Sequence, residues 1–174
     1  MSGMIHIYCG DGKGKTTAAT GLAVRAAGNE MKVLFTRFLK NEDSSELKIL
    51  DEIPNIHVLH LCKAYGFYHT LTEEKKLELL RTYRDLWRHI VEEIDQGTYQ
   101  VLIMDELIAA YNYEIIDQEQ VRNFLEHKPE DLEIIMTGRN PAKELLELSD
   151  YVSEIKKIKH PFDKKISARK GIEY

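Results

Sequence analysis

The chain has 174 residues, of which 43% are apolar and 30% are charged, and its formal net charge is −5. This length and composition are typical of one globular domain, so we treat residues 1–174 as a single unit with its own core. The acidic balance argues against nucleic-acid binding, which needs cationic contacts to phosphates, and no apolar run approaches the ~20 residues that span a membrane.

The first half of the chain alternates between strand-like and helix-like patterns. Residues 4–9 form a short apolar run that ends at glycines, which indicates a buried strand. Residues 15–27 follow with alanines and leucine at helical spacing. The β-rich segments 32–39 and 56–61 predict two further strands, and residues 41–54 between them predict a loop with a short helix.

A long helix is expected to begin near Thr72, a good N-cap residue, and to end at Gly97. Apolar residues at helical spacing predict its buried face: Leu77, Leu80, Tyr83, Trp87, Ile90 or Val91, and Ile94. We interpret Trp87 as a core residue. The segments 101–104, 132–137 and 151–158 predict three more strands.

Strands that alternate with helices predict right-handed crossover connections. The expected fold is therefore an α/β fold like that of P-loop NTPases, with a mostly parallel sheet of five or six strands and helices on both faces. Ligands of such folds bind beyond the carboxyl ends of the strands.

Neither a secretory signal nor a disulfide is expected. The first ten residues, MSGMIHIYCG, lack a basic stretch followed by a long apolar one. Cys9 and Cys62 lie far apart and form no CxxC motif. We therefore expect two reduced thiols in a cytoplasmic protein.

Residues 9–17, CGDGKGKTT, nearly match the phosphate-binding pattern G-x-x-x-x-G-K-[ST], but Cys9 stands where the first glycine is expected. The segment lies between a predicted strand and a predicted helix, so its backbone N–H groups and the helix N-terminus can converge on anionic oxygens. Lys15 would supply a point charge, and Thr16 would ligate Mg²⁺. The residues expected to cradle the phosphates are Gly10, Asp11, Gly12, Lys13, Gly14, Lys15, Thr16 and Thr17.

Two other strand ends carry candidate site residues. The apolar run VLIM delivers Asp105 and Glu106 to the edge where the phosphate loop is expected, so Thr16, Asp105 and Glu106 form a candidate Mg²⁺ or Mn²⁺ site. Glu106 could instead orient an attacking water in an ATPase, or support the metal site in a transferase. Arg139 follows the strand at 132–137 and should point into the same crevice.

The last 21 residues, 154–174, contain seven Lys or Arg and three Asp or Glu. Such a charge run is usually a solvated tail. The sequence SARKGIEY is neither repetitive nor purely polar, which favours a folded segment.

One set of motifs covers the chain from Gly10 to Tyr174: GDGKGKTTAATGLAVRAAG, FLK, GFYH, VLIMDE, TGRNP, LLELSDYVSEIKKIKHPFD and ARKGIEY. Together they resemble the ATP:corrinoid adenosyltransferases of the CobA/BtuR type, whose members also lack the first P-loop glycine. The resemblance implies transfer of the 5′-deoxyadenosyl group from ATP to a reduced Co(I) corrinoid, with release of triphosphate. ATP lies across the loop in the reverse sense in this family, so an adapted loop is expected.

The same resemblance implies the roles of individual residues. Co(I) is itself the nucleophile, so the protein needs to position the substrates and to stabilise the leaving triphosphate. Lys15, Thr16, Asp105 and Phe67 are the implied catalytic residues. Lys40 and Glu46 are expected near the nucleotide, and the C-terminal segment is expected to help cover it.

The corrinoid side is implied by Gly66 to His69, the GFYH segment. Several relatives have Gly-Phe-Thr-Trp there, and the Phe and Trp keep the corrinoid without a lower axial ligand. Phe67 matches that Phe, whereas His69 replaces the Trp, and Tyr68 could substitute for it. The resemblance also implies a homodimer and a flavodoxin-like electron donor.

Two other functions stay open from the sequence. An ordinary P-loop ATPase or kinase would use Glu106 to position water or an acceptor, and would release orthophosphate or ADP. A non-catalytic carrier of nucleotide or corrinoid would bind its ligand without forming a carbon–cobalt bond.

Overall fold

The computed structural model describes residues 2–39, 45–61, 65 and 68–173. Within these ranges, six strands form one parallel sheet with the order β3-β2-β4-β5-β1-β6. The strands are β1 Ile5–Cys9, β2 Val33–Arg37, β3 Ile56–His60, β4 Val101–Asp105, β5 Glu133–Thr137 and β6 Tyr151–Glu154. The predicted α/β fold with a parallel sheet is confirmed.

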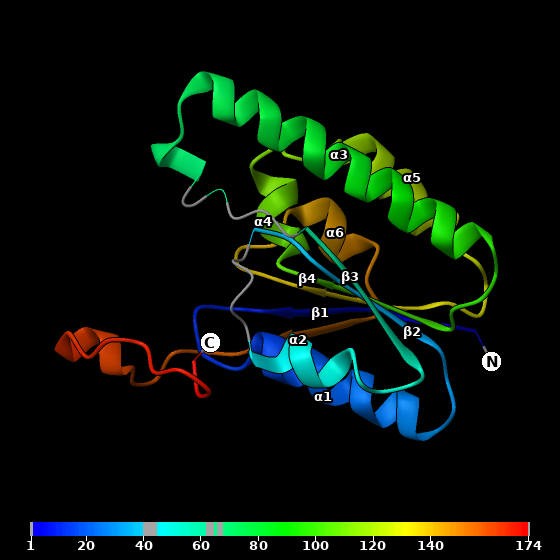
Figure 1. Cartoon of the computed structure of the whole chain (residues 1–174), viewed down its shortest axis with the longest axis horizontal. Helices are drawn as coiled ribbons and strands as arrows, with labels where there is room; N and C mark the ends of the chain where they lie inside the picture. Colours follow the sequence, from blue (N-terminus) through cyan, green and yellow to red (C-terminus); the bar gives the residue numbers. More distant parts are fainter. Residues whose placement is uncertain (1, 40–44, 62–64, 66–67, 174) are drawn as a thin grey trace.

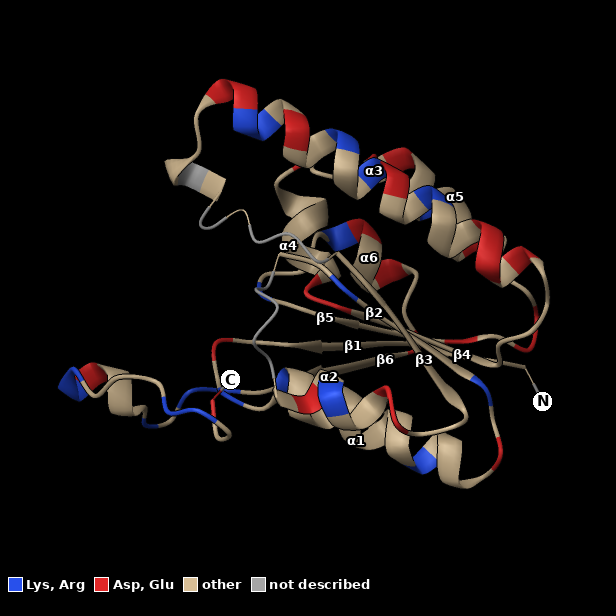
Figure 2. Ribbon diagram, viewed as in Figure 1, with Lys and Arg blue, Asp and Glu red and all other residues tan. Residues whose placement is uncertain are grey.

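Helices cover both faces of this sheet, as Figure 1 shows. The helices are α1 Lys15–Gly28, α2 Ser45–Leu50, α3 Glu73–Asp95, α4 Leu107–Asn112, α5 Gln118–Glu126 and α6 Lys143–Glu147, with 3₁₀ turns η1 Tyr68–Thr70 and η2 Pro161–Lys164. Helices α1 and α2 lie on one face, and α3 to α6 lie on the other. Figure 2 shows charged residues along the outer helices and mostly uncharged strands between them.

Strands β2, β4 and β5 read as nearly continuous apolar runs because both of their faces are buried, whereas all four residues of the edge strand β6 are exposed. Leu34, Leu102 and Ile134 belong to the core under α3, whereas Phe35 and Ile103 belong to the core over α1. Successive side chains of a strand point to opposite faces, so β2, β4 and β5 contribute to both cores.

The long helix begins where the sequence predicts, because Thr72 caps its first turn by accepting a hydrogen bond from the Lys75 N–H at 3.4 Å. Trp87 is a core residue, 3% exposed, and packs edge-on against Phe124. The prediction that Leu77 faces the core is wrong, because its side chain is 58% exposed. The buried residues are Leu79, Tyr83, Leu86, Trp87, Ile90 and Ile94.

Helices α4, α5 and α6 are not predicted from the sequence. These helices span only six, nine and five residues, which is too short for a clear apolar period. The last strand ends at Glu154 rather than near residue 158, because the chain then turns onto the phosphate loop. Across the described ranges, no helix is both long enough and apolar enough to cross a bilayer.

We expect Leu79→Ala to lower the free energy of unfolding by about 2–5 kcal/mol, because it opens a cavity at a fully buried position between α3 and the sheet. Leu77→Ala is the matched control on the same helix. It should cost less than about 0.5 kcal/mol because Leu77 is exposed. Urea denaturation of both variants measures the difference, and equal losses would contradict this assignment of the buried face.

Candidate phosphate-loop site

The phosphate loop, residues 10–14, connects β1 to α1 at the carboxyl edge of the sheet. Lys15 and Thr16 open the helix, so the first turn of α1 presents its N-terminus to this edge, where anions bind favourably. Lys15 is 8% exposed, and its Nζ donates a hydrogen bond to the Gly12 carbonyl at 2.9 Å. The lysine is therefore held against the loop, while Thr17 lies exposed beside it.

Two loop glycines are required by the segment that follows β6. The Gly12 N–H donates to the Ile155 carbonyl at 2.8 Å, and the Ile155 N–H donates to the Cys9 carbonyl at 2.8 Å. A Cβ on Gly10 or Gly12 would lie 2.4 or 2.6 Å from that Ile155 oxygen. The sequence predicts that Gly10 and Gly12 let phosphate come close to the backbone. In the structure, the group that comes close to these two glycines is the Ile155 carbonyl of the same chain.

Gly14 differs from those glycines. Its φ of 119° lies in the region that favours glycine, and a Cβ there would have no heavy atom within 4 Å. This backbone is therefore the open part of the loop.

Cys9 needs no glycine because it is still part of β1. It pairs with Glu154 of β6, and its side chain is 6% exposed. Burial raises the pKa of the Cys9 thiol, and the neighbouring Glu154 carboxylate raises it further. The position where the motif expects a glycine is therefore the last residue of a strand, and it accommodates a neutral, buried side chain. The other cysteine, Cys62, lies outside the described residues.

Asp105 is the point where the site's elements meet. It ends β4 and is fully buried, and its Oδ1 accepts hydrogen bonds from Thr16 Oγ1 at 2.9 Å and from Thr137 Oγ1 at 2.6 Å. Thr137 ends β5 and in turn accepts the Glu106 N–H at 2.9 Å. Glu106 has a φ of 59°, a conformation that non-glycine residues adopt rarely and often at functional sites. Of the predicted metal set, the structure brings Thr16 into contact with Asp105, and Glu106 follows Asp105 in the chain. Thr137 was not predicted from the sequence.

The sequence also missed Arg37, which ends β2 beside these carboxylates. Its side chain is buried, and its Nη1 lies 3.9 Å from Glu46 Oε1 of α2. Burial lowers the pKa of Arg37, and Glu46 and Asp105 act in the opposite direction. Glu46 therefore reaches the site through Arg37. In the sequence, a charged residue at the end of an apolar strand was the feature that could have identified Arg37 as a candidate site residue.

The C-terminal segment folds back toward the phosphate loop. The Lys157 N–H donates to Asp11 Oδ1 at 2.9 Å, which lowers the pKa of the Asp11 carboxyl, and the positive charge of Arg139 adds to this effect. Arg139 itself is exposed on the strand end next to the loop.

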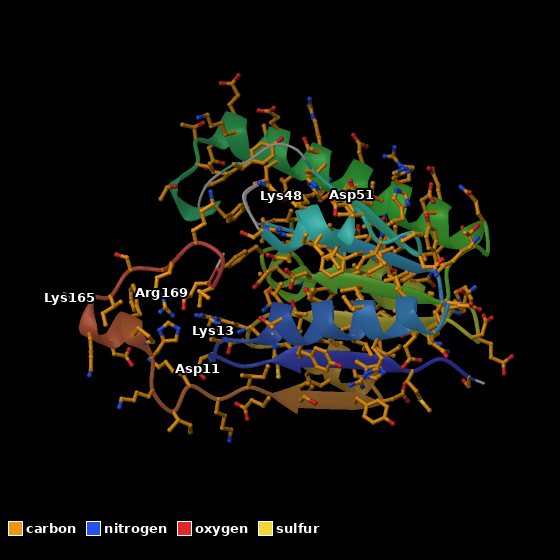
Figure 3. The ribbon with its side chains drawn as sticks, turned by 60° about the horizontal axis from the view of Figure 1, so that its bottom comes forward. Asp11, Lys13, Lys48, Asp51, Lys165 and Arg169 are labelled. Carbon is orange, nitrogen blue, oxygen red and sulfur yellow. The ribbon has the colours of Figure 1, made fainter. Side chains whose placement is uncertain are left out.

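Farther along this segment, Arg169 binds Glu173 by two side-chain hydrogen bonds, which lower the pKa of Glu173 to about 2. The positive charge of Lys13 also lowers the pKa of Glu173. Figure 3 shows Lys13 on the phosphate loop and Arg169 on the C-terminal segment that lies next to it. Residues 156–172 bury no side chain beyond an intermediate level. The expected folded segment is thus a set of local turns rather than part of the core.

The predicted corrinoid and nucleotide residues lie partly inside and partly outside the described ranges. Lys40, Gly66 and Phe67 lie outside the described residues, and only the backbone of His69 is described, within η1. Tyr68 stacks on Tyr113 with ring centroids 5.6 Å apart and an interplanar angle of 9°. Tyr113 follows α4, so this pair lies on the α3 side of the sheet.

The oxygen donors at Asp105 suit a hard divalent cation. No cluster of three or more His, Cys, Asp or Glu that could hold a metal occurs among the residues that the structure describes. Mg²⁺ in nucleotide sites needs only one or two carboxylates, because phosphates and water complete its shell. Thr16, Asp105 and Glu106 therefore fit such an ion.

A groove of about 590 Å³ lies elsewhere, between α3 and α5, and is lined by Trp87, Val91 and Phe124 among others. It contains none of the predicted site residues.

The whole chain, residues 1–174, matches the family model described as ATP:corrinoid adenosyltransferase BtuR/CobO/CobP. The "Corrinoid adenosyltransferase" of Escherichia coli strain K12 is 33% identical over 99% of this chain and 86% of its own length. "Corrinoid adenosyltransferase CobA" of Salmonella typhimurium strain LT2 is 29% identical over the same shares. Among solved structures, the cytoplasmic domain of EssC aligns with a TM-score of 0.56 at 16% identity, over 96% of this chain and 34% of that one. This last likeness concerns the fold alone.

We expect Gly12→Ala to lower the free energy of unfolding by about 1–3 kcal/mol and to weaken ATP binding, because its Cβ would collide with the backbone at Ile155. Gly21→Ala is the control in α1, where nothing lies within 4 Å, and there alanine should be neutral or stabilising by up to about 1 kcal/mol. Thermal unfolding and calorimetric ATP titration measure both. Wild-type behaviour of Gly12→Ala would show that Ile155 does not hold the loop.

Proposed function

We propose that the phosphate-loop site holds ATP with its 5′ carbon directed at the cobalt of a bound corrinoid, since this chain belongs to the family of ATP:corrinoid adenosyltransferases. The enzyme transfers the 5′-deoxyadenosyl group of ATP to a reduced corrinoid and releases triphosphate. The family match over the whole chain, joined to the meeting of Lys15, Thr16 and Asp105 at one edge, carries this conclusion.

The residues of the loop suit stabilisation of a leaving triphosphate. In this reaction the 5′ carbon–oxygen bond breaks while the carbon–cobalt bond forms, and the electron pair of Co(I) supplies the new bond. The protein therefore needs to orient two substrates and to offset the negative charge on the departing oxygen. Lys15, the N-terminus of α1 and the exposed Lys13 and Thr17 provide positive charge and donors at that position.

We assign the metal to Thr16, Asp105 and Glu106. When bound, Mg²⁺ or Mn²⁺ would neutralise phosphate oxygens and fix the orientation of the chain of phosphates. A hydroxyl that donates its hydrogen to a carboxylate presents oxygen lone pairs in its other directions, which is the form that coordinates a cation. The Thr16–Asp105 hydrogen bond sets up that form.

The corrinoid is proposed to bind on the α3 side of the same edge. The resemblance assigns Phe67 to the lower face of the corrin ring, whereas His69 stands where relatives have Trp. Tyr68, between them in the sequence, stacks on Tyr113. A flavodoxin-like protein that delivers the electron, a homodimeric assembly and a cytoplasmic location, where ATP is abundant, complete the proposal.

Lys15→Ala should lose about 2–4 kcal/mol of transition-state stabilisation, or roughly 10²- to 10³-fold in rate, because a charge-assisted contact in a partly dry site disappears. The measurement is anaerobic formation of adenosylcobalamin from ATP, Mg²⁺ and chemically reduced cobalamin, with triphosphate quantified as the second product. Lys32→Ala, an exposed lysine between α1 and β2, is the control and should be unchanged.

A folded Lys15→Ala protein with near-normal turnover would refute the phosphate role of Lys15. Release of orthophosphate without a carbon–cobalt bond would instead indicate an ATPase.

Asp105→Asn should raise the MgCl₂ concentration needed for half-maximal activity by roughly tenfold or more, because a neutral amide binds a divalent cation more weakly than a carboxylate. Asp51→Asn, an exposed position after α2, serves as the control. If the two variants give the same Mg²⁺ titration, Asp105 has a structural role only.

A further inference from the structure

We propose that Thr137 is a positioning residue for the metal–triphosphate site, acting through Asp105 and Glu106 without touching either substrate. The inference rests on the proposed ATP and metal site, and it adds a residue that the phosphate-loop and strand-end motifs do not contain. Thr137 is the last residue of β5 and is fully buried.

The position of β5 explains why a residue there matters. The phosphate loop follows β1, and Asp105 ends β4, but these two strands are not neighbours, because β5 lies between them. Thr16 therefore reaches Asp105 over the end of β5. Thr137 occupies the end of β5, so its side chain can contact Asp105 and Glu106 at the end of β4.

The Thr137 hydroxyl makes two contacts of different kinds. It donates to Asp105 Oδ1 at 2.6 Å, which is the length of a strong hydrogen bond to a charged acceptor. It also accepts the Glu106 backbone N–H at 2.9 Å. One oxygen thus fixes the carboxylate of one candidate ligand and the backbone of the next.

The contact of Thr137 with Asp105 is buried and its contact with Glu106 is partly buried, and this burial strengthens their effect. Asp105 and Thr137 are each fully buried, and a carboxylate in such a place depends on the few donors that reach it. With Thr137 in place, Asp105 Oδ1 receives two hydroxyl hydrogens, and the Thr16 hydroxyl keeps the direction that suits a cation. The Glu106 backbone is likewise held at its positive φ, which sets where its side chain begins.

Removal of the Thr137 hydroxyl tests this role in the full-length protein. Thr137→Val keeps the shape but loses both contacts, and Thr137→Ser restores the hydroxyl. We expect Thr137→Val to raise the MgCl₂ concentration that half-saturates ATP binding by roughly 10- to 100-fold, as for other residues that orient metal ligands. ATP binding without added metal should change little, and Thr137→Ser should stay within about threefold of wild type.

Thr36→Val is the matched control. Thr36 is also fully buried, on the neighbouring part of the sheet, but its hydroxyl donates to the Ile103 carbonyl at 2.9 Å, away from the site. It should lose stability and keep the wild-type Mg²⁺ dependence. Calorimetric titration with ATP at several MgCl₂ concentrations, without corrinoid, gives the readout independently of turnover. If Thr137→Val does not fold, Thr137→Ala replaces it.

The outcomes separate this inference from the proposed function. If wild-type ATP binding depends on Mg²⁺ but the Thr137 variants without a hydroxyl keep the same dependence, or shift no more than Thr36→Val, the inference is overturned alone. If wild-type ATP binding shows no Mg²⁺ dependence, the metal site itself fails and the inference fails with it. A selective shift that serine rescues supports the positioning role.

Discussion

A single buried carboxylate oxygen joins the parts of this site. Asp105 Oδ1 accepts hydrogen bonds from Thr16 of α1 and Thr137 of β5, so the first turn of α1 and the ends of β4 and β5 are fixed to one atom. A buried carboxylate is costly unless donors surround it, so the neighbouring elements must stay in register for the fold to be stable. The same requirement keeps Thr16 and Asp105 together at the edge where we propose that a metal and phosphates bind.

A second constraint comes from the end of the chain. Residues 155–157 continue beyond β6 and bind the loop through the Gly12 N–H, the Cys9 carbonyl and the Asp11 carboxylate. The loop is therefore supported from outside by a segment more than 140 residues away. Gly10 and Gly12 permit this contact, so the loop sequence reflects the approach of Ile155 as well as the phosphate binding that we propose.

The chemistry of the family explains why so few reactive groups are needed. Since the reduced corrinoid brings its own nucleophile, the site needs positive charge, orientation and a stable frame rather than a protein nucleophile. We propose that Lys15 and the N-terminus of α1 supply the positive charge, and that the hydrogen bonds around Asp105 supply the frame. Arg37 and Glu46 extend this frame toward α2.

The sequence by itself determined the strands, the helices α1 and α3, and the position of the phosphate loop between β1 and α1. These follow from apolar periodicity, capping residues and glycine spacing, which are local properties of the sequence. It also paired Thr16 with Asp105, since the carboxyl ends of parallel strands share an edge. Only the tertiary structure decided the roles of Thr137, Arg37 and Ile155. Their contacts depend on which strands are neighbours and on where the last segment turns, and no local pattern encodes either.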